Sequence, residues 1–168
     1  MNSGRLVVVA GPPLAGKSTL AKELVLRLNA ILLSMDELRE VLFPHGRHSR
    51  SERDACYRTM HWLASKILQG GKSVVLDATY ARPTQRRALE LLRSGSGVPM
   101  TVIECKVAPD EAVRRFLHRS SLHPARDLTP ERVRLLAARY RYTKKGLVLE
   151  MTDTVARLAE RALREVEK

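Results

Sequence analysis

The sequence is poor in cysteine and aromatic residues and has no long hydrophobic run. Its two cysteines, Cys56 and Cys105, are far apart and form no C-x-x-C pair. This spacing excludes a disulfide framework or zinc site and predicts two buried, reduced thiols. No apolar run approaches the roughly 20 residues that span a bilayer, and the first run is too short for a signal peptide. We therefore expect a cytoplasmic protein with no membrane partner.

Aromatic residues make up only 4% of the chain. This scarcity argues against an extensive base-stacking surface for single-stranded nucleic acid. The histidines also lack metal-ligand spacing on a shared helix face, so surface or loop positions are expected for them. They are His45, His48, His61, His118 and His123.

The balance of charge is strongly basic, with 30 Lys and Arg against 18 Asp and Glu and a formal net charge of +12. Such a charge favours a phosphate-rich partner, either nucleic acid or a nucleotide together with a phosphorylated substrate. An arginine-rich composition also arises from genomic base composition or from life at high temperature. Charge alone therefore does not decide the function.

The hydrophobic pattern alternates between strands and helices along the whole chain, without an internal repeat or linker. It predicts one α/β domain over residues 1–168, with a five-stranded parallel sheet and helices on both faces. The expected strands are 6–10, 30–34, 73–77, 98–107 and 147–151. The expected helices are 16–29, 36–43, one through 56–67, 83–93, 109–119, one capped by Thr129-Pro130 and a last one capped by Thr152-Asp153.

Two polar segments are expected to lie between these elements. Residues 94–97, Ser-Gly-Ser-Gly, are typical of a turn. Residues 120–127 contain Pro124 and are polar, which predicts a mobile loop between the fourth and fifth strands.

The most specific motif is a phosphate-binding P-loop of the form G-x-x-x-x-G-K-S, which follows the first strand and opens the first helix. Backbone N–H groups of such a loop and the N-terminus of the helix form an anion cradle. Lys17 would bind the β- and γ-phosphates, and the Ser18 hydroxyl would ligate Mg²⁺. The sequence therefore predicts binding of ATP and Mg²⁺ by Gly11, Pro12, Pro13, Leu14, Ala15, Gly16, Lys17, Ser18 and Thr19.

Two aspartates follow predicted strands at the edge of the sheet where ligands collect. Asp77 ends the run Val74-Val75-Leu76-Asp77, which has the form of a Walker B strand. It would hold the metal, although Asp is also a common turn residue. Asp36 would accept a proton from a substrate hydroxyl, or it would serve as the N-cap of the next helix. Arg39, one turn later, is a candidate contact for a substrate phosphate.

Arginines gather before the polar loop. Arg115 and Arg119 are four residues apart and share a helix face, and Arg126 follows them. Guanidinium groups on a flap can close over a triphosphate and neutralise the charge that develops during transfer. The other interpretation is a solvated basic face. The spacing beside the loop favours a lid that carries arginines.

Together these motifs resemble the P-loop kinase family typified by polynucleotide 5′-hydroxyl kinases, a group that also includes zeta-toxin-like and small-molecule kinases. The resemblance runs from about Leu6 to Asp153. It implies Lys17 and Asp36 as catalytic residues, with Asp36 as general base, and Arg115 and Arg119 as lid arginines. It further implies that Arg39, Asp77 and Thr79 bind the acceptor and that Asp153 lies near the adenine. The motifs are Gly11–Thr19, Ser34-Met35-Asp36-x-x-Arg39, Val75-Leu76-Asp77-Ala78-Thr79 with Arg86 or Arg87 downstream, and Arg115/Arg119.

The function expected from these residues is an ATP-dependent kinase that transfers the γ-phosphoryl group to a hydroxyl. The basic segments 47–53 and 139–145 favour a polynucleotide 5′-hydroxyl as acceptor. A sugar, a nucleoside or an antibiotic is the alternative acceptor. A nucleotide-binding ATPase or switch without an acceptor is the alternative function, although no N-K-x-D guanine motif is present.

Overall fold

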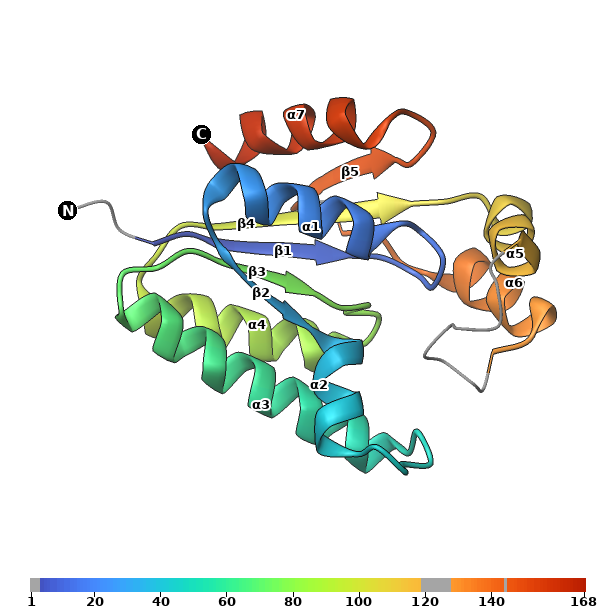
Figure 1. Ribbon diagram of the computed structural model, residues 1–168, viewed down its shortest axis with the longest axis horizontal. Helices are drawn as coiled ribbons and strands as arrows, with labels where there is room; N and C mark the ends of the chain where they lie inside the picture. The colour runs from blue at the N-terminus through green and yellow to red at the C-terminus, as the bar shows by residue number, and fades with distance from the viewer. Residues whose placement is uncertain (1–3, 119–127, 144) are drawn as a thin grey trace.

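A five-stranded parallel sheet forms the centre of the fold (Figure 1). The computed structural model describes residues 4–118, 128–143 and 145–168. Within them the strand order is β2-β3-β1-β4-β5, and every pairing is parallel. The strands are β1 (Leu6–Ala10), β2 (Ile31–Ser34), β3 (Val74–Asp77), β4 (Met100–Lys106) and β5 (Leu147–Glu150). The predicted fold class is thereby confirmed.

Helices cover both faces of this sheet (Figure 1). On one face lie α1 (Lys17–Leu28) and α7 (Val155–Val166). On the other lie α3 (Arg50–Gln69) and α4 (Pro83–Ser96), with the short α2 (Met35–Leu42) beside the end of α3. The remaining helices, α5 (Pro109–His118) and α6 (Pro130–Arg139), pack together beyond the carboxyl ends of the strands.

The central strand β1 explains why the core has two halves. All five of its residues are buried, and side chains along a strand point alternately to opposite faces. Val7 and Val9 therefore join the apolar cluster under α1 and α7. Leu6, Val8 and Ala10 join the cluster under α3 and α4. Burial on both faces accounts for the uninterrupted hydrophobic run in the sequence.

Two helix ends differ from those predicted. Helix α4 runs through Ser96, and Gly97 ends it in a left-handed conformation, so Ser94–Ser96 is the last turn of a helix. Glycine breaks a helix only weakly, and the surrounding helix overrides it here. Helix α7 is capped by Thr154, whose hydroxyl accepts a hydrogen bond from the Arg157 amide, and not by Thr152-Asp153.

The cap predicted at Thr129 is confirmed, because its hydroxyl accepts a hydrogen bond from the Arg132 amide at 3.2 Å and Pro130 follows as the first helical residue. Arg119, Arg126 and the predicted loop 120–127 lie outside the described residues. Among the residues that are described, none of the helices is both long enough and apolar enough to cross a membrane.

A cluster of three rings, two of them buried, joins α3 to the segment after β3. His61 of this cluster is a partly buried residue of α3, so the surface or loop position expected for it is wrong. The Tyr57 hydroxyl accepts a hydrogen bond from the Tyr80 amide at 3.1 Å. The Tyr80 hydroxyl lies 3.0 Å from His61 Nε2, and the two rings stack. Tyr80 has a φ of 47°, a left-handed conformation that is strained for a bulky residue. These contacts hold the strained residue in place.

Burial lowers the pKa of His61 to about 4, from 6.5. Because the folded pKa lies below the unfolded one, its contribution to stability is complete above pH 6.5 and is lost as the pH falls towards 4. In that window the free energy of unfolding should fall by about 1.4 kcal/mol per pH unit through this group. Urea unfolding across the window should therefore give a shallower pH dependence for His61→Gln than for the wild type. The exposed His118→Gln variant is the control, and parallel profiles for all three proteins would contradict the assignment.

Candidate functional site

The P-loop joins β1 to α1 through backbone conformations that two glycines make possible. Gly11 has a φ of 145°, and a Cβ there would lie 2.6 Å from the Cys105 carbonyl oxygen of β4. Gly16, directly before α1, has a φ of 91°. A side chain at Gly11 would therefore collide with the neighbouring strand, and at either position it would strain the backbone.

The loop has the form of an anion cradle. Lys17 is the first residue of α1, and its Nζ donates a hydrogen bond to the Pro12 carbonyl at 2.8 Å, so the side chain folds back over the loop. The N-terminus of α1 carries unpaired amides and a positive partial charge at the same place. The loop backbone, the helix end and the ammonium group together match the phosphates of a nucleotide.

Two cavities lie beside this loop, and both are lined by Leu14 and Gly16. One, of about 400 Å³, is bordered by α5 and α7 and is here called the α5 cavity. The other, of about 320 Å³, is bordered by α2, α3 and α6 and is called the α2 cavity. The α5 cavity is lined further by Thr19, Arg114, Arg115, His118, Met151, Asp153, Val155 and Leu158.

Arg115 lies at the α5 cavity and connects three elements. Its guanidinium donates hydrogen bonds to the Leu14 carbonyl at 3.2 Å and to the Met151 carbonyl at 2.8 Å. Its Nε donates to Glu111 at 2.8 Å. Hydrogen bonds from Arg114 and Arg115 lower the pKa of Glu111 to about 2. Arg115 is thus held against the P-loop, on the same side as Asp153.

The α2 cavity brings together the other predicted residues. Lys17 and Ser18 of the P-loop, Asp36 and Arg39 of α2, and Asp77 and Thr79 at the end of β3 all line it. They come from three strand ends that lie next to one another, because β1, β3 and β2 are neighbours in the sheet. Parallel strands bring their carboxyl ends to one edge, which explains the convergence.

Asp77 is the buried acid of this cavity, with 5% of its surface exposed. Burial raises the pKa of its carboxyl group, while Lys17 and a hydrogen bond from Ser18 oppose that rise. Carboxylate and hydroxyl oxygens are suitable ligands for Mg²⁺. The described residues contain no group of three or more His, Cys, Asp or Glu placed to hold a metal. A metal here would fit the magnesium pattern, in which water and substrate phosphates supply the remaining ligands.

Asp36 lies in the first turn of α2, and Ser34 occupies the cap position before the helix, so the interpretation of Asp36 as an N-cap is wrong. Its carboxylate pairs with Arg39 at 3.1 Å. Half of the Asp36 side chain is exposed, whereas only 12% of the Arg39 side chain is. The carboxylate is therefore accessible from the cavity and oriented by the arginine beneath it.

Several residues of the α2 cavity were not predicted from the sequence. They are Tyr57 of α3, Arg82 and Gln85 at the start of α4, and Arg132 and Leu136 of α6. Each lies on an amphipathic helix or in a loop, and none belongs to a recognised sequence motif. The only available signal was the short distance in sequence between Asp77 and Arg82. Arg53 and Tyr140, which also line the cavity, belong to the basic segments 47–53 and 139–145 that the sequence associates with the acceptor.

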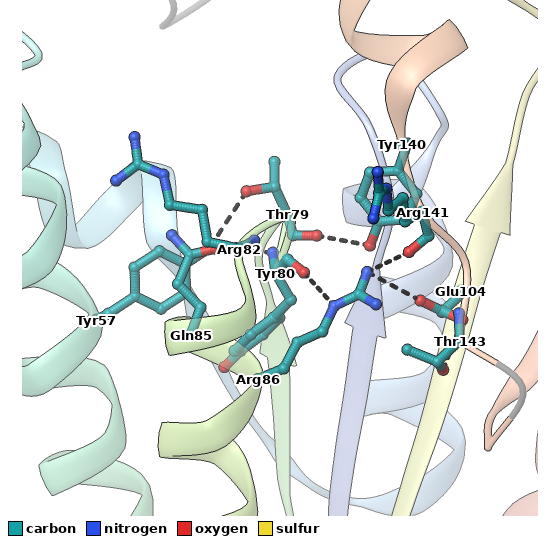
Figure 2. A network of polar contacts seen from close by, with 10 residues as sticks. All are labelled: Tyr57, Thr79, Tyr80, Arg82, Gln85, Arg86, Glu104, Tyr140, Arg141 and Thr143. Carbon is teal, nitrogen blue, oxygen red and sulfur yellow. Dashed lines mark hydrogen bonds and ion pairs between the residues drawn. The ribbon is translucent and has the colours of Figure 1, made fainter.

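A polar network fixes the wall of the cavity that contains Thr79 (Figure 2). The Thr79 carbonyl accepts hydrogen bonds from the Gly11 amide of the P-loop at 3.4 Å and from the Tyr140 hydroxyl at 2.8 Å. Arg86 donates to the Tyr80 carbonyl at 2.7 Å and to the Arg141 carbonyl at 2.6 Å. The segment after β3 is thereby tied to the segment after α6.

A buried carboxylate anchors this network. Glu104 of β4 is 1% exposed, and it accepts hydrogen bonds from the Thr143 amide and hydroxyl at 2.6 and 2.9 Å. It also pairs with Arg86 at 3.5 Å. Arg86 lies over the Tyr140 ring, 5.5 Å from its centre. The charge of Arg86 is therefore already neutralised within the protein.

The residues 6–144 match the model of the AAA_33 family, described as an AAA domain. The chain belongs to this family. One relative, the uncharacterized protein Rv2004c of Mycobacterium tuberculosis, is 29% identical over 147 residues, which cover 80% of this chain and 29% of that protein. The chain thus spans less than a third of the length of the curated relatives that it matches.

Solved structures support the same fold for this AAA domain. A kinase candidate from Chloroflexus aurantiacus superposes with a TM-score of 0.81 at 22% identity, over 97% of this chain and 98% of the other. An APS kinase of M. tuberculosis, in complex with AMPPNP and APS, superposes with a TM-score of 0.78 at 19% identity and full coverage of both chains. The fold is that of P-loop kinases.

Arg115 offers a test of how the P-loop is held. Because its guanidinium joins the Leu14 and Met151 carbonyls beside the α5 cavity, Arg115→Gln should weaken nucleotide affinity by roughly tenfold through the loss of charge-assisted hydrogen bonds. Titration calorimetry with an ATP analogue measures this. The matched control is Arg27→Gln, an exposed arginine that also pairs with a glutamate one turn earlier, Glu23, but lines neither cavity. If affinity is unchanged and only turnover falls, Arg115 acts in the transition state as a lid residue would.

Proposed function

We propose that this AAA domain is an ATP-dependent kinase that transfers the γ-phosphoryl group of ATP to a hydroxyl group. The observation that carries the proposal is the α2 cavity. A protein that only binds a nucleotide needs one cavity beside its P-loop. Here a second one contains an accessible carboxylate, Asp36, and a buried one, Asp77. A second substrate fits there.

In this proposal the nucleoside of ATP occupies the α5 cavity, next to Asp153 and Arg115, and its phosphates lie along residues 11–19. The shared lining of the two cavities by Leu14 and Gly16 directs the γ-phosphate towards the α2 cavity. Ser18 and Asp77 would hold Mg²⁺, which neutralises phosphate charge when bound. Lys17 binds the β- and γ-phosphates.

The chemical step is an in-line displacement at the γ-phosphorus. The acceptor oxygen forms a bond to phosphorus, and the bond from phosphorus to the β–γ bridging oxygen breaks, so ADP leaves with that electron pair. Asp36 takes the hydroxyl proton, and Arg39 holds its carboxylate in place. Arg132, which lines the cavity from α6, would neutralise charge on the transferred group. Arg119 remains a candidate lid residue.

Two classes of acceptor are compatible with the site. The basic segments near α3 and after α6 favour a polynucleotide 5′-hydroxyl, whereas a cavity of about 320 Å³ also suits a sugar, a nucleoside or an antibiotic. A screen of these acceptors with labelled ATP tests the proposal directly. Hydrolysis of ATP without transfer to any acceptor would favour the ATPase or switch function.

Asp36→Asn tests the general base. The change preserves shape but removes the charge that accepts the proton, a contribution of order 10²–10⁴ in rate. Single-turnover transfer should therefore drop steeply, while binding of the Mg²⁺ complex of ATP and thermal stability change little. Glu37→Gln, an exposed neighbour on α2, is the matched control. Transfer by Asp36→Asn at the wild-type rate would move the role to another group, with Asp77 the next candidate.

Lys17→Ala tests the donor site. The ammonium group is the only side-chain cation that the P-loop motif itself supplies, so its loss should reduce transfer by orders of magnitude. The fold, followed by circular dichroism, should be unchanged because Lys17 is part-exposed. Lys22→Ala, on the exposed side of α1, should behave as the wild type. Normal turnover of Lys17→Ala would overturn the assignment of the loop.

A further inference from the structure

The α2 cavity has more positive charge than the transfer reaction requires. Five cationic side chains line it, Lys17, Arg39, Arg53, Arg82 and Arg132, against the two carboxylates of Asp36 and Asp77. Lys17 is placed for the donor phosphates, and Arg39 is paired with Asp36. Arg53 and Arg82 enter from α3 and the start of α4, on the side of the cavity formed by the helices that cover one face of the sheet. They need a different explanation.

Arg82 is the most informative of them. Its Nη1 is buried and has no hydrogen-bond partner within the described residues. Buried donors are nearly always paired, since an unpaired one costs free energy. Arg86, four residues later, makes the contrast clear, because Glu104 and two carbonyls satisfy it. Figure 2 shows the Arg82 guanidinium turned away from that network.

The backbone before Arg82 is held rigidly. Tyr80 is fixed in its left-handed conformation by Tyr57 and His61, and the Arg82 amide donates to the Gln85 side chain at 3.0 Å. Arg86 ties the same segment to the rest of the cavity wall. Arg82 is therefore presented from a preorganised loop, as a binding residue requires.

The aromatic rings of the cavity do not form a free stacking platform. The Tyr140 ring is covered by Arg86 and Tyr142, and its hydroxyl donates to Thr79. The Tyr57 ring packs on Tyr80, and its hydroxyl is bonded to the Tyr80 amide and to Thr79. With both tyrosines engaged, the recognition of a second substrate falls to the arginines.

We propose that Arg82, together with Arg53, forms an anion subsite for the acceptor, so that the molecule phosphorylated by this domain already carries a phosphate group near its reacting hydroxyl. That the bound molecule is a phosphoryl acceptor rests on the proposed function, but the binding of an anion at this subsite can be tested without it. A guanidinium fork matches the oxygens of a phosphate, which accept two hydrogen bonds at once. The phosphate belongs either to a small phosphorylated metabolite or to a nucleotide chain.

The first experiment measures binding without transfer. Inorganic phosphate is titrated, by calorimetry, into protein saturated with AMPPNP and Mg²⁺, so that the P-loop is already filled. We expect one phosphate to bind, and Arg82→Gln or Arg53→Gln to weaken it by roughly tenfold to a hundredfold. The matched control is Arg87→Gln, an exposed arginine on α4 outside the cavity. No saturable binding, or equal binding by Arg82→Gln and the wild type with circular dichroism unchanged, overturns the subsite.

The second experiment identifies the source of the phosphate and separates the two proposals. Acceptors are compared in pairs with and without a phosphate: glycerol 3-phosphate and glycerol, ribose 5-phosphate and ribose, and a 5′-hydroxyl dinucleotide and a nucleoside. The phosphorylated member should be preferred at least tenfold by the wild type and by Arg87→Gln, but not by Arg82→Gln. Phosphate binding that depends on Arg82 without transfer to any acceptor would reject the kinase and retain the subsite. Transfer with no preference within the pairs would reject the subsite and retain the kinase.

Discussion

The structure depends on the sharp exit of the chain from its most buried strand. At Gly11 the backbone leaves β1 so close to β4 that a Cβ would lie 2.6 Å from a carbonyl oxygen. This approach turns the amides of the P-loop outwards at the carboxyl edge of the sheet, where α1 begins. The α5 and α2 cavities both border this loop, which is held by hydrogen bonds from Arg115 to the Leu14 carbonyl and from the Gly11 amide to the Thr79 carbonyl.

Two carboxylates are buried near this edge, and a buried charge is costly unless it is paired and hydrogen-bonded. Asp77 keeps a raised pKa because burial disfavours its charged form, and Glu104 is buried with two hydrogen bonds and one ion pair to satisfy it. The two acids differ in what surrounds them. Glu104 is surrounded by protein donors and is structural, whereas Asp77 faces a cavity. A buried acid with a perturbed pKa that faces a cavity, as Asp77 does, is characteristic of functional sites.

Much of this could be predicted from the sequence, because the signals were local. The buried strands, the P-loop and the two aspartates after strands are recognised from runs of a few residues. Among the arginines of the α2 cavity, Arg39 was predicted and Arg53 belongs to a segment already recognised as basic. Arg82 and Arg132 were not predictable, since they come from the residue before α4 and from α6, which only the tertiary fold brings together. Arg115 illustrates the opposite case. Its position on a helix was predicted, but its contacts with Leu14 and Met151 lie 101 and 36 residues away in sequence.

The division between Arg86 and Arg82 shows how a basic protein can use its charge selectively. The two arginines are four residues apart, yet Arg86 is neutralised by the buried Glu104 whereas Arg82 has a buried Nη1 without a hydrogen-bond partner among the described residues. In the proposed subsite, an anion would give the unpaired Nη1 of Arg82 an acceptor and would offset the excess of five cationic over two anionic side chains that line the cavity. A neutral hydroxyl compound would bring no charge to do so. The proposal therefore makes charge the property by which the cavity selects its acceptor.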